Sequence, residues 1–171
     1  MKTKQLRQGS GLNSNEEERG SFRLVGIAAR TRNSDELDGR GKIPALWQRF
    51  FQENIAAQIP GQKRPGEILA AYTQFESDET GAYTIVIGAD VDTSATVPES
   101  MTCIEISASR YRVVSTERGK LSEVGIDAWM KIWKDTELKA GRTYRADLEI
   151  YGVDAADPEN ARFDILLGVA E

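Results

Sequence analysis

One carboxylate in the second half of the chain is embedded in an apolar, aromatic segment that should be a β-strand, residues 144–151. Strand alternation places Asp147, Glu149 and Tyr151 on one face of that strand and aliphatic residues on the other. If helices cover the face of Glu149, water is excluded and the attraction between this carboxylate and a cation becomes stronger. Glu149 is therefore the first candidate for a ligand-binding group.

Aromatic side chains in two other segments are candidates for the walls around that carboxylate. Trp129 and Trp133 are one helical turn apart, and Trp47 and Phe51 repeat this spacing in the first half of the chain. The face of an aromatic ring attracts a cation by about 0.5–2 kcal/mol. An aromatic cleft with one desolvated carboxylate would suit a flat, lipophilic organic cation.

Both features also have ordinary structural explanations. An acidic residue on an alternating strand most often lies on the solvated face, and helical aromatic residues most often fill a core. Spacing alone therefore leaves Glu149 and the tryptophans open between a ligand-binding role and a structural one.

Composition excludes several classes of function. The net charge is −5 and the sequence pI is about 5.0, which argues against direct nucleic-acid binding because phosphates require clustered Lys and Arg. The chain has no histidine and a single cysteine, Cys103, so Ser-His-Asp and Cys–His catalysis and the usual zinc sites are ruled out. No glycine-rich phosphate loop or spaced set of metal ligands is present, and we expect neither a metal nor a cofactor.

The distribution of apolar residues sets the expected compartment and the domain boundary. The sequence has no long apolar run and no apolar signal segment near its start, so we expect a cytoplasmic protein with no membrane span. Residues 1–20 are polar and rich in Gly, Ser and Asn, which predicts a disordered tail. Residues 21–171 are expected to form a single domain.

The two halves of this domain repeat one pattern. Trp47 matches Trp129 and Gly88 matches Gly168, with nearly the same spacing between helix and strands. In the strand between the helix and the glycine, the repeat matches Gln74 of the first copy with Glu149 of the second. The repeat predicts two units, residues 21–92 and 101–171 approximately, each running strand, helix, strand, strand.

This order of elements predicts an α+β fold. Each helix is followed by a hairpin, so the strands are expected to form one antiparallel sheet with two helices on one face and a groove between them. The expected helices lie near 43–55 and 121–133, and the hairpins near 69–91 and 144–169.

The repeated order, the segment RYRVVSTERG at 110–119, the helix AWMKIW and the strand ADLEIYG together resemble the GyrI-like domain family. That family includes the effector-binding domains of AraC-type and MerR-type multidrug regulators and small proteins from mobile gene cassettes. The resemblance covers residues 21–170. Because the polar residues before 21 are too few for a helix-turn-helix module, it implies a free-standing sensor without a DNA-binding partner.

The resemblance implies roles for individual residues. The acidic residue of the Glu-x-Tyr strand lies in the groove of drug-binding members and pairs with cationic ligands, which corresponds to Glu149 here. The implied groove walls are aromatic: Trp47, Phe51, Tyr72, Trp129, Trp133 and Tyr151. Family members often have His-x-Gly where residues 117–119 read Glu-Arg-Gly, so no role of that histidine is carried over.

The first functional hypothesis is a small-molecule binding protein that sequesters lipophilic cations or regulates a partner in response to them. Two alternatives stay open. The same glutamate, with Tyr151, could act as a general base in hydrolysis of electrophilic small molecules, as reported for some GyrI-like proteins. The groove could instead take a segment of a partner protein, as an inhibitor or interaction module does.

Overall fold

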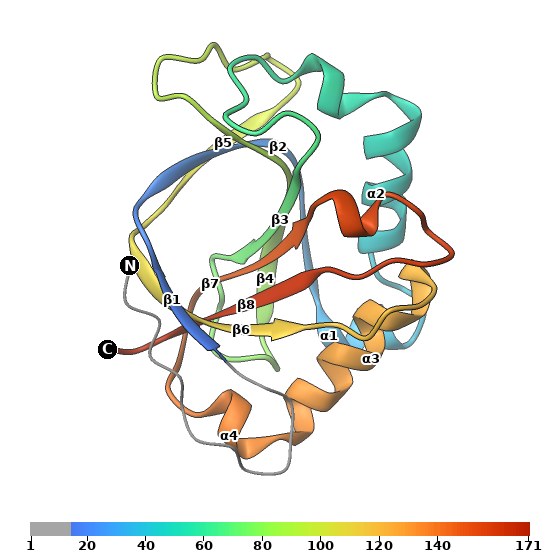
Figure 1. Cartoon of the computed structure of the whole chain (residues 1–171), viewed down its shortest axis with the longest axis vertical. Coiled ribbons are helices and arrows are strands. Elements are labelled where there is room, and N and C mark those ends of the chain that lie inside the picture. The colour runs from blue at the N-terminus through green and yellow to red at the C-terminus, as the bar shows by residue number, and fades with distance from the viewer. Residues whose placement is uncertain (1–14) are drawn as a thin grey trace.

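The structure is a computed structural model that describes residues 15–171 (Figure 1). Its strands are β1 (Asn15–Arg19), β2 (Phe22–Arg32), β3 (Ile68–Thr73), β4 (Ala82–Val91), β5 (Thr102–Ile106), β6 (Ser109–Ser115), β7 (Arg142–Tyr151) and β8 (Asp164–Val169). Its helices are α1 (Asn33–Leu37), α2 (Ile43–Gln52), α3 (Leu121–Lys134) and α4 (Thr136–Lys139), with short 3-10 helices at Ile55–Gln58 and Val153–Ala155. Within this part of the chain, no helix has the length and apolarity needed to cross a membrane.

All eight strands form one antiparallel sheet in the order β1-β6-β8-β7-β3-β4-β2-β5, which confirms the predicted α+β class. The repeated units are β2-α2-β3-β4 and β6-α3-β7-β8. They meet where β3 pairs with β7, and the order of strands outward from that junction is the same on both sides. The predicted second unit included residues 102–106, but these form β5, which pairs with β2 on the edge of the first unit.

The register of the two hairpins corrects the predicted match of Gln74 with Glu149. Ile87, which precedes Gly88, pairs with Ala70 in β3. Leu167, which precedes Gly168, pairs with Asp147 in β7. Ala70 and Asp147 are therefore equivalent, and two residues further along Tyr72 is equivalent to Glu149. Gln74 lies beyond the end of β3. The connections within the two hairpins differ in length, so one constant offset cannot be carried across them.

Helices α2 and α3 pack on the same face of the sheet, each over its own unit (Figure 1). In α3, Val124, Ala128 and Ile132 are buried at four-residue intervals and contact β8 residues such as Ile165. In α2, the buried residues Leu46 and Phe50 do the same over the first unit. Trp47 and Trp129 follow one position after Leu46 and Ala128, which turns them from these cores toward the junction.

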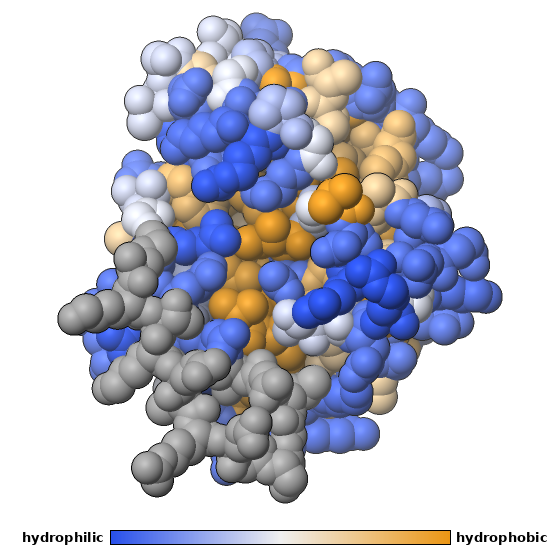
Figure 2. Space-filling view, in the orientation of Figure 1, coloured by the Kyte–Doolittle hydropathy of each residue, from blue (hydrophilic) through white to orange (hydrophobic). Residues whose placement is uncertain are grey.

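The opposite face of the sheet is also apolar. Figure 2 shows hydrophobic residues in the hollow that the curled sheet surrounds. Leu24, Val86, Leu148 and Leu166 belong to this cluster and are at most 1% exposed. Because both faces of the central strands are covered, the solvated-face interpretation of Glu149 is wrong: its side of β7 lies under the helices, and the residue is 4% exposed.

The expectation of a disordered tail is wrong for residues 15–19. They form β1, which pairs with β6 at one edge of the sheet. Acidic residues of β1 lie beside basic residues of β6, with Glu18 3.3 Å from Arg110 and Glu16 3.5 Å from Arg112. The remainder of the predicted tail, residues 1–14, lies outside the described residues.

Candidate ligand-binding site

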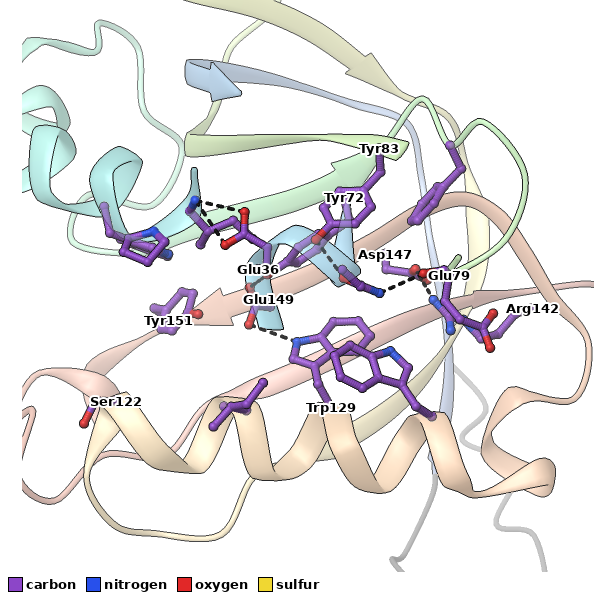
Figure 3. A pocket seen from close by; sticks show the side chains of 18 residues that line it. Glu36, Tyr72, Glu79, Tyr83, Ser122, Trp129, Arg142, Asp147, Glu149 and Tyr151 are labelled. Atoms are coloured by element: carbon purple, nitrogen blue, oxygen red, sulfur yellow. Dashed lines mark hydrogen bonds and ion pairs between the residues drawn. The ribbon is translucent and has the colours of Figure 1, made fainter. Parts of the chain in front are cut away.

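A cavity of about 340 Å³ lies between α2 and α3 at the junction of the two units (Figure 3). Its apolar wall is mostly aromatic: Trp47, Tyr72, Phe75, Tyr83, Trp129, Trp133 and Tyr151. Its acidic and basic lining residues are Glu36, Glu79, Arg142, Asp147 and Glu149. A cavity of this size and composition accommodates a small aromatic molecule and offers it a few polar contacts.

Glu149 is positioned by β7 at the junction strand pair. It lies opposite Ala70 of β3, whose small side chain leaves room for the carboxylate on the helix side of the sheet. Tyr72 donates its hydroxyl to Oε1 of Glu149 at 2.5 Å, and Trp129 donates Nε1–H to Oε2 at 3.4 Å. Both donors are neutral, so the carboxylate is hydrogen-bonded without a cationic partner among the described residues.

The environment of Glu149 opposes its ionisation. Burial raises the pKa of the Glu149 carboxyl, and the hydrogen bonds from Tyr72 and Trp129 offset part of that rise. Burial and the nearby glutamate also raise the pKa values of Tyr72 and Tyr151 well above 10, so both phenols stay protonated and neutral. The site therefore holds a carboxyl group that a positive charge would favour in its ionised form.

The other lining carboxylates differ from Glu149 because each has strong partners. Glu79, in the β3–β4 turn, lies 2.6 Å from Lys139 Nζ and accepts the Tyr144 hydroxyl, and these contacts outweigh desolvation and lower its pKa to about 2. Glu36 accepts the backbone N–H groups of Lys42 and Ile43 at the start of α2, at 2.7 and 3.2 Å. Glu79 and Glu36 therefore each join neighbouring segments of the chain at the border of the cavity.

Asp147 is fully buried and pairs with Arg142. Nη2 of Arg142 lies 2.7 Å from Oδ2 of Asp147, and the two side chains are 2% and 1% exposed. The other carboxylate oxygen accepts the backbone N–H of Gly168 at 2.9 Å. The guanidinium also lies 4.4 Å from the ring centre of Tyr144. This is a structural ion pair that forms one end of the cavity (Figure 3).

Most of the aromatic residues predicted for the site line the cavity, but Phe51 does not. Trp47 packs edge-on against Tyr151, with ring centres 5.1 Å apart, and Trp129 packs edge-on against Tyr72 at 5.4 Å. These pairs flank Glu149 from the two helices. Phe51 stacks on Trp47 but is 61% exposed and does not line the cavity.

Sequence reasoning missed Arg142 as a lining residue. Simple alternation from Glu149 places Arg142 on the opposite face of β7. An irregularity in the strand between Arg142 and Asp147 shifts the register, so Arg142 lies on the same face as Glu149. Tyr144, within this bulge, has a left-handed backbone (φ 52°), which its sequence gives no reason to expect. Across residues 15–171, no group of three or more His, Cys, Asp or Glu side chains is arranged to hold a metal ion.

The family of the chain follows from comparison with known proteins. Residues 17–169 match the Cass2 family, described as integron-associated effector-binding proteins. The chain belongs to this family. The assignment confirms the resemblance to the GyrI-like effector-binding domains.

Relatives of this Cass2 member agree with that assignment. It is 28% identical over 147 residues to the putative transcriptional regulator YobU of Bacillus subtilis, covering 86% of this chain and 91% of YobU. The integron cassette protein VCH_CASS2 from the mobile metagenome of Vibrio cholerae is 26% identical, with a TM-score of 0.69 and coverage of 92% and 95%. SAV2435, solved bound to tetraphenylphosphonium, shares the fold at 20% identity, with a TM-score of 0.75 and coverage of 92% and 93%.

Proposed function

We propose that this protein binds lipophilic aromatic cations in the cavity between α2 and α3, with Glu149 as the charge partner. The observation that carries the proposal is a difference among the lining carboxylates. Glu79 and Asp147 have cationic partners, and Glu36 caps a helix, but Glu149 is 4% exposed and contacts only neutral donors. A buried carboxylate without a counter-charge is costly, and a bound cation would remove that cost.

The walls of the cavity support an aromatic ligand. Rings of Trp47 and Tyr151 lie on one side of Glu149, and rings of Tyr72 and Trp129 on the other. A cation between them gains attraction from the ring faces as well as from the carboxylate. Tetraphenylphosphonium, which the fold relative SAV2435 binds, is a ligand of this chemical class and a suitable probe.

The test is calorimetric titration with tetraphenylphosphonium, with tetraphenylborate as a control of similar shape and opposite charge. The wild type should bind the cation and not the anion. Glu149→Gln, which keeps the size of the side chain, should weaken cation binding at least tenfold, or about 1.4 kcal/mol. Equal binding of the cation by wild type and Glu149→Gln would refute the role of the carboxylate.

A matched variant separates this local effect from a general change in charge. Glu123→Gln removes one negative charge from the exposed side of α3 without touching the cavity, so cation affinity should change less than about twofold. Recovery of the ligand unchanged after long incubation, judged by mass spectrometry, would favour binding over the hydrolase alternative.

A further inference from the structure

Arg142 has hydrogen-bonding capacity that the fold does not use. Its side chain is 2% exposed, and only Nη2 contacts Asp147. Nε and Nη1 are buried and have no hydrogen-bond partner among the described residues. Buried N–H groups are nearly always paired because an unmade hydrogen bond is costly, so two free donors on one guanidinium are unusual.

The Arg142 side chain borders the same cavity as Glu149. Arg142 lines the cavity and is held by Asp147, which lies two residues before Glu149 on the same face of β7. Two residues of a strand span about 7 Å. Trp129 connects the two positions, since its Nε1 reaches Glu149 and its ring centre lies 6.0 Å from the Arg142 guanidinium carbon (Figure 3).

We infer that the preferred ligand is an aromatic cation that also carries an uncharged hydrogen-bond acceptor, such as a carbonyl or ether oxygen, which Arg142 binds while Glu149 holds the positive charge. The inference rests on the proposed function and narrows its ligand class.

The acceptor is uncharged because Asp147 already neutralises Arg142. The ion pair between Nη2 and Oδ2 leaves the guanidinium with donors to satisfy but without a net charge to balance. A second anion placed here would lie beside the carboxylates of Asp147 and Glu79 and would be repelled by both. A neutral oxygen gains the hydrogen bonds without that repulsion.

The test compares two small cations of nearly the same shape. Trimethylphenylammonium with a para-acetyl group carries a carbonyl oxygen across the ring from the charge, at a separation comparable to two strand residues. Its para-isopropyl counterpart has the same outline and no acceptor. The wild type should bind the acetyl compound roughly tenfold more tightly, as expected for a hydrogen bond to a charged donor.

Arg142→Lys assigns this preference to a residue. Lysine retains the charge and the ion pair with Asp147 but lacks the forked donors of the guanidinium. The preference for the acetyl compound over the isopropyl compound should fall to less than about twofold in this variant. Circular dichroism checks that the Arg142→Lys variant is folded. The comparison of the acetyl and isopropyl cations in the wild type does not depend on any variant.

The outcomes separate the two proposals. Equal binding of both cations by the wild type would overturn the inference about Arg142 and leave the cation pocket standing. A preference that persists in Arg142→Lys would overturn the role of Arg142. Binding of neither cation would overturn the proposed function and this inference together.

Discussion

The hydroxyl of Tyr72 donates a 2.5 Å hydrogen bond to Glu149 from the equivalent position of the other unit. The second unit thus contributes the acid, and the first contributes a neutral hydroxyl group that donates a hydrogen bond to it. The phenol stays protonated because burial and the adjacent carboxyl raise its pKa well above 10. This pair is the chemical centre of the cavity, and several measurable properties depend on it.

Cation affinity should increase with pH. Because burial raises the pKa of Glu149 in the empty site, a bound cation favours the carboxylate, lowers that pKa and releases a proton. Below the pKa of the empty site the affinity should fall about tenfold per pH unit, and above it the affinity should be constant. Titration with tetraphenylphosphonium from pH 4 to pH 8 measures this profile, and a flat profile would contradict it.

Tyr72→Phe should move that profile to higher pH. The hydrogen bond from Tyr72 lowers the pKa of Glu149, so its loss leaves desolvation less opposed and the pKa rises further. Tyr83→Phe is the matched control, because its hydroxyl donates to Asn33 and not to Glu149. The midpoint of the affinity profile should shift only in Tyr72→Phe; the same shift in both variants would point to a general effect of losing a phenol.

Glu149→Gln should stabilise the empty protein at neutral pH. The folded-state pKa of Glu149 lies above its unfolded value, so ionisation opposes folding. This destabilisation is absent below the unfolded pKa, near pH 4, and grows as pH rises toward the folded pKa. Urea unfolding should therefore give the variant an advantage at pH 7 that disappears at pH 4. A variant that is less stable at both pH values would contradict this.

Trp129 and Phe51 should differ in their effect on binding. Trp129→Leu removes a cavity wall and a donor to Glu149, and should weaken cation binding by about 1–2 kcal/mol, roughly tenfold. Phe51→Leu changes an exposed ring outside the cavity, so its effect should be less than about twofold. Tetraphenylphosphonium titrations of both variants test the corrected boundary of the site, which a strong Phe51 effect would extend.

Arg142→Ala should destabilise the fold, and the loss of stability should depend on pH. Removing Arg142 leaves a buried carboxylate unpaired, which typically costs about 3–5 kcal/mol. Burial raises the pKa of Asp147, and Arg142 offsets part of that rise. Without Arg142 the pKa of Asp147 rises further and the carboxyl is protonated more readily, so the loss of stability should be smaller at pH 4 than at pH 7. Urea unfolding at the two pH values checks this; equal losses at both would exclude Asp147 as the cause.

The fold and most of the candidate site could be predicted from periodicity. Alternation along β7 and the helical spacing of Trp129 and Trp133 placed these side chains on the faces where the structure has them. The helical spacing could not, however, predict which of the aromatic residues line the cavity. Phe51 repeats the position of Trp133 in the first unit, and both helices end one residue later, at Gln52 and Lys134. Trp133 nevertheless lines the cavity, whereas Phe51 is 61% exposed and lies outside it.

Arg142 and Glu79 were not predictable for different reasons. Arg142 reaches the cavity only through the bulge in β7, where a non-glycine residue has a left-handed backbone that no sequence signal marks. Glu79 lies in a turn, and its ion pair with Lys139 joins segments from the two different units. Local patterns carry no information about such a contact, because it exists only after both units have packed together.

Because Tyr72 and Glu149 occupy equivalent positions of the two units, a symmetric homodimer of one unit could not form this site. A homodimer of a single unit would carry the same residue twice at the two-fold axis. Glutamate there would place two buried acids within hydrogen-bonding distance, and only one could ionise. Tyrosine there would provide no charge for a cation. Fusion of the two units in one chain lets the positions diverge, so a single negative charge can stand at the centre of a nearly symmetric cavity.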